Sequence, residues 1–232
     1  MGTKGTVAFD IIGTCFSLEK PRQSLISLGA PAHSLELWFA QSLRDAFALS
    51  YAGGYQPLIE VLAAELPRTM KLLGITADKT QLEKVIASVS ELELQPGALP
   101  AFQSLIDAGW RIVALTNGSE HSTRQLLERA KAIDYFSSIF SCDAIAKTKP
   151  HADVYAMPKQ DANGDLWLVA AHAWDIQGAA RANLKTAFIT KSEQEYLSIY
   201  PQPDVIANDL VEATNKIINA NKRDSAACFS AP

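Results

Sequence analysis

Polar side chains that could do chemistry follow apolar stretches at four places in the sequence. They are Asp10, Thr116 with Asn117, Lys149, and Asp175. Together they offer carboxylate, hydroxyl, amide and ammonium groups, which are the groups of nucleophilic and acid–base chemistry. Each has an ordinary explanation by itself, because a strand-end threonine often caps the next helix and an aspartate at a helix start suits the helix dipole. Those explanations do not predict this order across successive strands, so we expect the groups to share one site.

The first of these residues ends a short apolar run. Val7-Ala8-Phe9 is typical of a buried strand, and Asp10 would lie at its carboxyl end. In open α/β sheets this is the edge where ligands bind. Gly13 allows the backbone to turn sharply there, and Thr14 adds a hydroxyl beside the carboxylate. The alternative for this stretch alone is an aspartate that only caps a turn.

The rest of the chain divides into a part without strands and a part in which strands alternate with helices. Residues 15–96 contain helical patterns and no clear strand. The strands expected after that part cover residues 111–115, 166–170 and 185–190, with shorter ones near 139 and 204–206. Such alternation predicts an α/β fold with a doubly wound parallel sheet. An all-helical insertion after the first strand would lie over the catalytic edge as a lid that excludes water.

These patterns also predict domain boundaries. A core domain would combine residues 1–14 with 97–222, and a helical cap domain would cover residues 15–96. The last segment, 223–232, would be a loose tail.

Composition narrows the classes of function. The chain of 232 residues is 48% hydrophobic, which suffices for a sizeable core, and its net charge of −4 gives no basic surface for nucleic acid. No run approaches the roughly 18 apolar residues that a membrane span requires. The three cysteines suggest neither a disulfide framework nor a zinc site, so we expect a reducing, cytoplasmic compartment. The expected partner is a small-molecule substrate.

The order Asp, Thr-Asn, Lys-Pro and Asp resembles the haloacid dehalogenase superfamily of hydrolases, and the resemblance extends to about residue 220. It implies a Rossmann-like core in which Asp10 is the nucleophile, Thr116 the hydroxyl residue, Lys149 the lysine and Asp175 an acid of the fourth motif. In that chemistry a carboxylate attacks carbon or phosphorus to form an ester, a lysine keeps it ionised, and a second carboxylate orients the hydrolytic water. We place Thr14 in the same catalytic set.

Two positions argue against the phosphatases of this superfamily. Those enzymes have a second aspartate two residues after the nucleophile and another four residues before the position of Asp175. This chain has Ile12 and Ala171 there, and neither can transfer a proton or bind magnesium. We therefore expect no cofactor, with magnesium required only if a phosphatase alternative holds.

The remaining motifs are similar to those of the type II 2-haloacid dehalogenases, which need no metal. The resemblance assigns Asn117 to the leaving halide, matches Tyr155 to the tyrosine of the third motif, and places Trp174 in the halide pocket. Ile11 and Tyr155 are further candidates for substrate binding. Because such relatives are often dimers, a homodimer is also expected.

The chain departs from this pattern at the lid and in the fourth motif. Where the dehalogenases have an arginine after a Leu-Trp pair, Trp38 is followed by Phe39. We expect Trp38 or Phe39 to point at the cleft above Asp10. His172 replaces an asparagine, and it can either position a water molecule or cap the following helix.

The sequence thus favours a metal-independent hydrolase that forms an ester on Asp10 and cleaves the carbon–halogen bond of a short 2-haloacid. Two alternatives stay open. One is a phosphatase of the same superfamily with atypical metal ligands. The other is a non-catalytic binding protein that keeps the fold, for which the apolar Phe39 is the best support.

Overall fold

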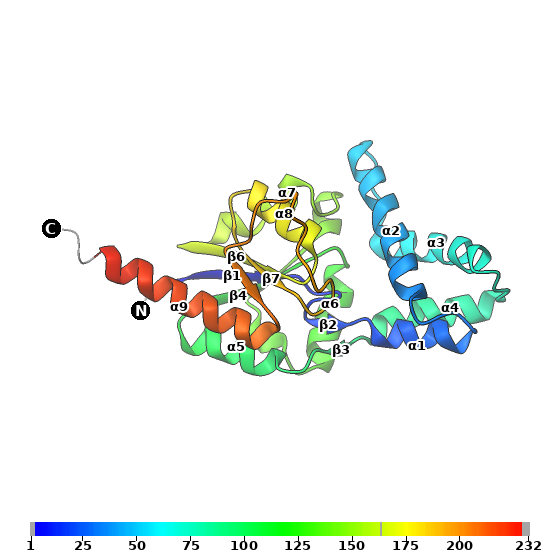
Figure 1. Cartoon of the computed structure of the whole chain (residues 1–232), viewed down its shortest axis with the longest axis horizontal. Helices are drawn as coiled ribbons and strands as arrows, with labels where there is room; N and C mark the ends of the chain where they lie inside the picture. The colour runs from blue at the N-terminus through cyan, green and yellow to red at the C-terminus, as the bar shows by residue number, and fades with distance from the viewer. Residues whose placement is uncertain (1–2, 163, 229–232) are drawn as a thin grey trace.

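A computed structural model describes residues 3–162 and 164–228 of the chain (Figure 1). Its main sheet has six parallel strands in the order β5-β4-β1-β6-β7-β8. The strands are β1 (Gly5–Phe9), β4 (Arg111–Thr116), β5 (Ser138–Ser141), β6 (Asp165–Ala170), β7 (Lys185–Ile189) and β8 (Val205–Ala207). The predicted doubly wound parallel sheet is confirmed.

Helices cover both faces of the sheet. They are α5 (Ala98–Asp107), α6 (Glu120–Arg129), α7 (Ala152–Ala156), α8 (Ala173–Arg181) and α9 (Leu210–Cys228). Val7 and Phe9 of β1 belong to the core shared with α5, α6 and α9, whereas Ala8 between them belongs to the core shared with α7 and α8. Because both faces are buried, the strands are apolar at successive positions instead of alternating with polar residues.

Short 3₁₀ turns connect several of these elements. They are η1 (Val89–Glu91), η2 (Ile133–Tyr135), η3 (Cys142–Ile145) and η4 (Pro158–Asp161). At the C-terminus α9 continues to Cys228, so the tail expected from residue 223 is helical as far as that residue. The rest of the expected tail, 229–232, lies outside the described residues. Among the described helices, none combines the length and apolar character that crossing a bilayer requires.

Four helices lie beyond the carboxyl edge of the sheet, apart from the helices that cover it (Figure 1). They are α1 (Glu19–Ser27), α2 (Ser34–Tyr51), α3 (Leu58–Leu72) and α4 (Lys79–Ser88). They have their own apolar core, which includes Leu25, Trp38, Leu62 and Leu66. We call this group the helical insert.

The segment expected to be all-helical also contains two short strands. β2 (Phe16–Ser17) and β3 (Glu93–Leu94) pair antiparallel at the two ends of the insert, with Phe16 opposite Leu94 and Ser17 opposite Glu93. Two residues are too few to produce an alternating pattern, so periodicity did not reveal these strands. They form a two-stranded ribbon between the helical insert and the sheet.

The topology places β1 between β4 and β6, in the interior of the main sheet. The chain runs outward from β1 through β4 and β5, then returns to the other side of β1 for β6. The direction of winding therefore reverses around β1, and ligands bind beside the carboxyl ends of the strands at such a point. Asp10 is the residue directly after β1.

Candidate active site

Lys149 joins the two acids of the predicted site. Its Nζ donates to Oδ1 of Asp10 at 3.0 Å and to Oδ2 of Asp175 at 2.7 Å. Lys149 and Asp175 are completely buried, and Asp10 is only 5% exposed. Buried charges need partners, and here one ammonium group serves two carboxylates. The structure thus brings together three predicted catalytic residues from three distant segments.

Thr14 ties the end of β1 to the end of β6. Its Oγ1 donates to Oδ2 of Asp10 at 2.7 Å and accepts from the backbone N–H of Ala171 at 2.9 Å. Gly13 has a φ of 85°, a value that favours glycine and that turns residue 14 back toward Asp10. Both carboxylate oxygens of Asp10 are therefore held in place, one by Thr14 and one by Lys149.

Tyr155 holds Asp175 from the other side. The Tyr155 hydroxyl donates to Oδ1 of Asp175 at 2.6 Å, and the ring is completely buried. Any side chain at Gly178 of α8 would collide with this hydroxyl. Tyr155 was a candidate for substrate binding, and in the structure its hydroxyl contacts Asp175.

Burial and charge oppose each other in this cluster. Burial lowers the pKa of Lys149, but attraction to Asp10 and Asp175 outweighs burial and holds that pKa above its ordinary value. Burial raises the pKa of Asp175; the charge of Lys149 opposes this rise and that of Asp10 adds to it. Lys149 is therefore a fixed cation between the two acids at neutral pH.

Asn117 is held by its carbonyl oxygen. Its Oδ1 accepts from the backbone N–H of Lys149 and from Sγ of Cys142, each at 3.0 Å. This arrangement leaves the Nδ2 group as the side of the amide that can donate to a leaving anion. Thr116 is buried, and its Oγ1 accepts from the backbone N–H of Gly118 at 3.0 Å, so its visible role is to shape the loop that carries Asn117.

A cavity of about 1270 Å³ lies between α2 of the helical insert and the carboxyl edge of the sheet. We call it the main pocket. The insert contributes apolar side chains that include Leu35, Phe39 and Phe47. The core contributes Gly13, His172, Trp174 and Glu193. Phe39, His172 and Trp174 are thus predicted substrate residues that line the pocket.

Four predicted substrate residues do not line this pocket: Asn117 and Tyr155, described above, and Trp38 and Ile11. Trp38 is 1% exposed inside the helical insert, and its Nε1 donates to the carbonyl oxygen of Leu62 at 3.0 Å. Ile11 is fully buried in the core of the sheet. In each case the apolar side chain is buried in a core and does not line the main pocket. Phe39, one residue after Trp38, faces the pocket instead.

His172 is fixed by contacts on three sides. Its Nδ1 lies 3.3 Å from Oε1 of Glu193, while the other oxygen of Glu193 accepts from the backbone N–H of Ala173 at 2.9 Å. Its ring stacks on Trp174 with centroids 5.6 Å apart and an interplanar angle of 13°. Phe39 of the insert lies 6.0 Å from it, centroid to centroid. His172 is the N-cap residue of α8, but its side chain makes no capping hydrogen bond.

Glu193 was not found from the sequence. It follows β7 by four residues, so it belongs to the same carboxyl edge as the other site residues. Like Asp10 and Asp175 it follows a strand of the main sheet, but the four intervening residues make its position a weaker signal in the sequence.

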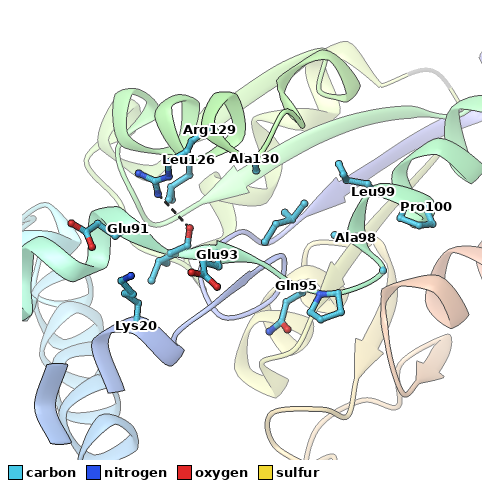
Figure 2. A pocket seen from close by; sticks show the side chains of 14 residues that line it. Lys20, Glu91, Glu93, Gln95, Ala98, Leu99, Pro100, Leu126, Arg129 and Ala130 are labelled. Atoms are coloured by element: carbon cyan, nitrogen blue, oxygen red, sulfur yellow. Dashed lines mark hydrogen bonds between the residues drawn. The ribbon is translucent and has the colours of Figure 1, made fainter. Parts of the chain in front are cut away.

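A second cavity, of about 810 Å³, lies on the other side of β3. Figure 2 shows its lining, with Lys20 from the insert, Leu126 and Arg129 from α6, and residues of the segment 91–100. The Arg129 guanidinium donates to the carbonyl oxygen of Leu92 at 3.3 Å, which fixes α6 to the segment that leads to β3 (Figure 2). None of the predicted site residues lines this cavity.

The acidic side chains of the predicted site, Asp10 and Asp175, are paired with Lys149. Among the described residues no group of three or more histidine, cysteine or acidic side chains could hold a metal ion. The ammonium group of Lys149 lies between the two carboxylates that a cation would need, and Ile12 and Ala171 are apolar.

The sequence relationship agrees with this geometry. The family of haloacid dehalogenase-like hydrolases matches residues 5–183, which is most of the chain. The chain therefore belongs to the haloacid dehalogenase-like hydrolases. The match includes β1 with Asp10, Lys149 and Asp175.

Individual relatives point to one branch of this family. The chain is 22% identical to (S)-2-haloacid dehalogenase H-109 of Pseudomonas putida over 218 residues, which cover 92% of this chain and 97% of the relative. The solved structure of L-2-haloacid dehalogenase from Xanthobacter autotrophicus superposes with a TM-score of 0.82 at 20% identity, over 94% of this chain and 98% of that one. A phosphoglycolate phosphatase of Nitrosospira multiformis is 29% identical, but over only 126 residues, 53% of this chain and 56% of the relative.

Proposed function

We propose that this protein is a metal-independent dehalogenase that hydrolyses the carbon–halogen bond of 2-haloacids through an ester on Asp10. The observation that carries the proposal is the fixed position of the Asp10 carboxylate between Thr14 and Lys149. A nucleophile held in one orientation by two donors needs little reorganisation before it attacks. The near full-length similarity to two (S)-2-haloacid and L-2-haloacid dehalogenases supports the choice of substrate class.

In the first step an oxygen of Asp10 attacks the carbon that bears the halogen, and the carbon–halogen bond breaks as the oxygen–carbon bond forms. The halide leaves with the bonding electron pair. We assign the amide Nδ2 of Asn117 and the edge of Trp174 to receive it; the occupied Oδ1 of Asn117 supports this, because it leaves Nδ2 as the donor. Attack opposite the leaving group inverts the carbon.

In the second step water attacks the carbonyl carbon of the Asp10 ester. The bond between that carbon and the substrate oxygen breaks, which releases the hydroxy acid and restores the Asp10 carboxylate. Lys149 and Asp175 support this step by keeping the charge around the ester fixed. No metal takes part in either step.

The helical insert acts as a cap over this chemistry. Phe39 and Phe47 of α2 face His172 and Trp174 of the core across the main pocket. On the far side of α2, Ser50 Oγ accepts from the backbone N–H of Thr148, which holds the insert against the core. Closure of this kind excludes water until the ester has formed.

The decisive experiment combines halide detection with isotope tracing. Chloride and bromide release is measured over a panel of short 2-haloacids, and a single turnover is run in ¹⁸O-water. We expect the label in the Asp10 carboxylate and not in the first hydroxy acid product. Label in the product at the first turnover would exclude an ester on Asp10. Magnesium-dependent release of phosphate from aryl phosphates, without halide release, would favour the phosphatase alternative that the Nitrosospira relative suggests.

A further inference from the structure

One ring nitrogen of His172 contacts Glu193, and the other is buried without a hydrogen-bond partner among the described residues. Nδ1 faces Oε1 of Glu193 at 3.3 Å, and because a carboxylate can only accept, Nδ1 carries the proton and donates. Nε2 is then the unprotonated nitrogen of the neutral ring. It is buried and has no hydrogen-bond partner among the described residues.

Nε2 of His172 lies over the turn that follows Asp10. A Cβ added to Gly13 would lie 2.6 Å from Nε2, so the ring fits there only because residue 13 has no side chain. Gly13 belongs both to this turn and to the wall of the main pocket. The stacking of Trp174 on one face of the ring, with Phe39 close by, restricts its rotation. Nε2 is therefore held against the turn that carries Gly13, three residues after Asp10.

Asp175, by contrast, has both carboxylate oxygens occupied. Its Oδ1 accepts from Tyr155 at 2.6 Å and its Oδ2 accepts from Lys149 at 2.7 Å. Both donors are completely buried, so breaking either hydrogen bond would leave a buried polar group without a partner, which costs free energy. A carboxylate committed in this way orients its neighbours better than it removes a proton.

We propose that His172, oriented by Glu193, is the general base that activates water for hydrolysis of the Asp10 ester. The inference rests on the ester intermediate of the proposed function. It assigns the proton transfer to His172 and not to Asp175. Glu193 is a positioning residue, because it acts only through the ring of His172. The arrangement of base and orienting carboxylate is the one that activates nucleophiles in many hydrolases.

The proton balance closes with these groups. Nε2 takes one proton from the attacking water as its oxygen bonds to the ester carbon. The same proton passes from Nε2 to the substrate oxygen as that oxygen leaves, which gives the neutral hydroxyl of the product. The second water proton is lost from the Asp10 carboxyl to solvent, so Asp10 returns as a carboxylate and His172 as a neutral imidazole.

The charges around His172 make its ring more basic. Burial lowers the pKa of His172, but the hydrogen bond to Glu193 and the charge of Asp10 outweigh burial and raise that pKa above its ordinary value. The charged groups nearest to it on the core side are Asp10, Lys149, Asp175 and Glu193. Those that share the main pocket with it are Glu19, Arg22, Glu36, Arg44, Glu93 and Lys191.

The first test separates the two chemical steps. His172→Asn, with His172→Gln as the second variant, is mixed with 2-bromopropionate, and bromide release and the mass of the Asp10 peptide are followed. We expect one bromide per active site in a burst, accumulation of the ester on Asp10, and steady turnover about 10²-fold to 10⁴-fold slower than in the unaltered enzyme. Steady turnover within a few fold of the unaltered enzyme in either folded variant, with no ester, would overturn the assignment.

The second test uses the pH profile. The part of the pH profile in which turnover rises with pH reports the deprotonation of the base. Glu193→Gln removes an interaction that raises the pKa of His172. This variant should therefore move the rising limb to lower pH. Glu195→Gln is the matched control, because Glu195 is exposed on the same segment, and it should leave the limb in place. An unmoved limb in Glu193→Gln would show that Glu193 does not act through His172. Absence of bromide release from the unaltered protein would instead overturn the proposed function, and this inference with it.

Discussion

Nζ of Lys149 lies 3.0 Å from Oδ1 of Asp10, and neither side chain has more than a few per cent of its surface in contact with solvent. Asp10 therefore depends on a single ammonium group that also serves Asp175. Removing one member of a buried charge cluster leaves the other members uncompensated, which is more costly than the loss of one hydrogen bond.

Lys149→Met should therefore damage both folding and activity. We expect the free energy of unfolding to fall by about 3–5 kcal/mol, because two buried carboxylates lose their cation. Urea unfolding measures this loss, and halide release should become undetectable. Lys84→Met, at an exposed position of α4, is the control and should change neither quantity appreciably. Near-normal turnover in Lys149→Met would show that this lysine has no part in the reaction.

Thr14 offers a subtler change at the same carboxylate. Thr14→Val keeps the shape of the side chain but removes the donor to Asp10 and the acceptor for the backbone N–H of Ala171. A buried polar group left without a partner costs about 1–3 kcal/mol, so we expect stability to fall by that amount and halide release to slow at least tenfold. Thr14→Ser keeps the hydroxyl and should recover most of both. If valine and serine behave alike, the hydroxyl is not what matters.

Removal of metal ions should not affect the reaction. Asp10 and Asp175 both accept from the ammonium group of Lys149, and the Ile12 side chain offers no oxygen ligand. Halide release measured after dialysis against excess chelator should equal that before it, and added magnesium should leave the rate unchanged. A rate that disappears with chelator and returns with magnesium would contradict the metal-independent mechanism.

The neighbouring aromatic residues of α2 should respond differently to substitution. Trp38→Phe removes the donor to the Leu62 carbonyl inside the helical insert, so stability should fall by about 1 kcal/mol with KM unchanged. Phe39→Ala removes a side chain from the wall of the main pocket, so KM for the best haloacid should change while stability changes little. Thermal unfolding and steady-state kinetics on the two variants distinguish these outcomes. A change in KM in Trp38→Phe alone would reverse the assignment of the two rings.

His172 should make the stability of the protein depend on pH. A histidine has a pKa of about 6.5 in the unfolded chain, and the folded-state pKa of His172 is raised. Its contribution to stability is therefore complete below about pH 6.5 and is lost as the pH rises through the folded-state pKa. The difference in unfolding free energy between the unaltered protein and His172→Asn should shrink from pH 5 to pH 9. A difference that stays constant over this range would contradict the raised pKa.

The sequence was most informative where strong local signals and simple topology agreed. Apolar runs ended by Asp10 and Thr116 marked strands, and parallel strands bring their carboxyl ends to one edge, so the common edge followed without any knowledge of contacts. Lys149 and Asp175 were placed with them for the same reason. The six-stranded sheet and the helical segment after β1 were predictable on these grounds.

The sequence was less informative where the packing of side chains determines which residue faces the pocket. Trp38 and Phe39 are adjacent on α2, and only the packing of the helical insert determines that the first is buried and the second faces the main pocket. Glu193 follows β7 through an irregular segment that has no periodicity to read. Tyr155 was recognised, but its partner depends on how closely α7 approaches Gly178 of α8.

The pairing of Phe16 with Leu94 has a consequence for how the molecule can change. The chain leaves the sheet and returns to it at neighbouring points, so everything between these residues is attached like the loop of a hairpin. Lengthening, shortening or replacing that loop leaves the register of the parallel strands, and with it the position of Asp10, untouched. Selection can therefore exchange the surface that meets the substrate while the groups that break the bond are inherited unchanged.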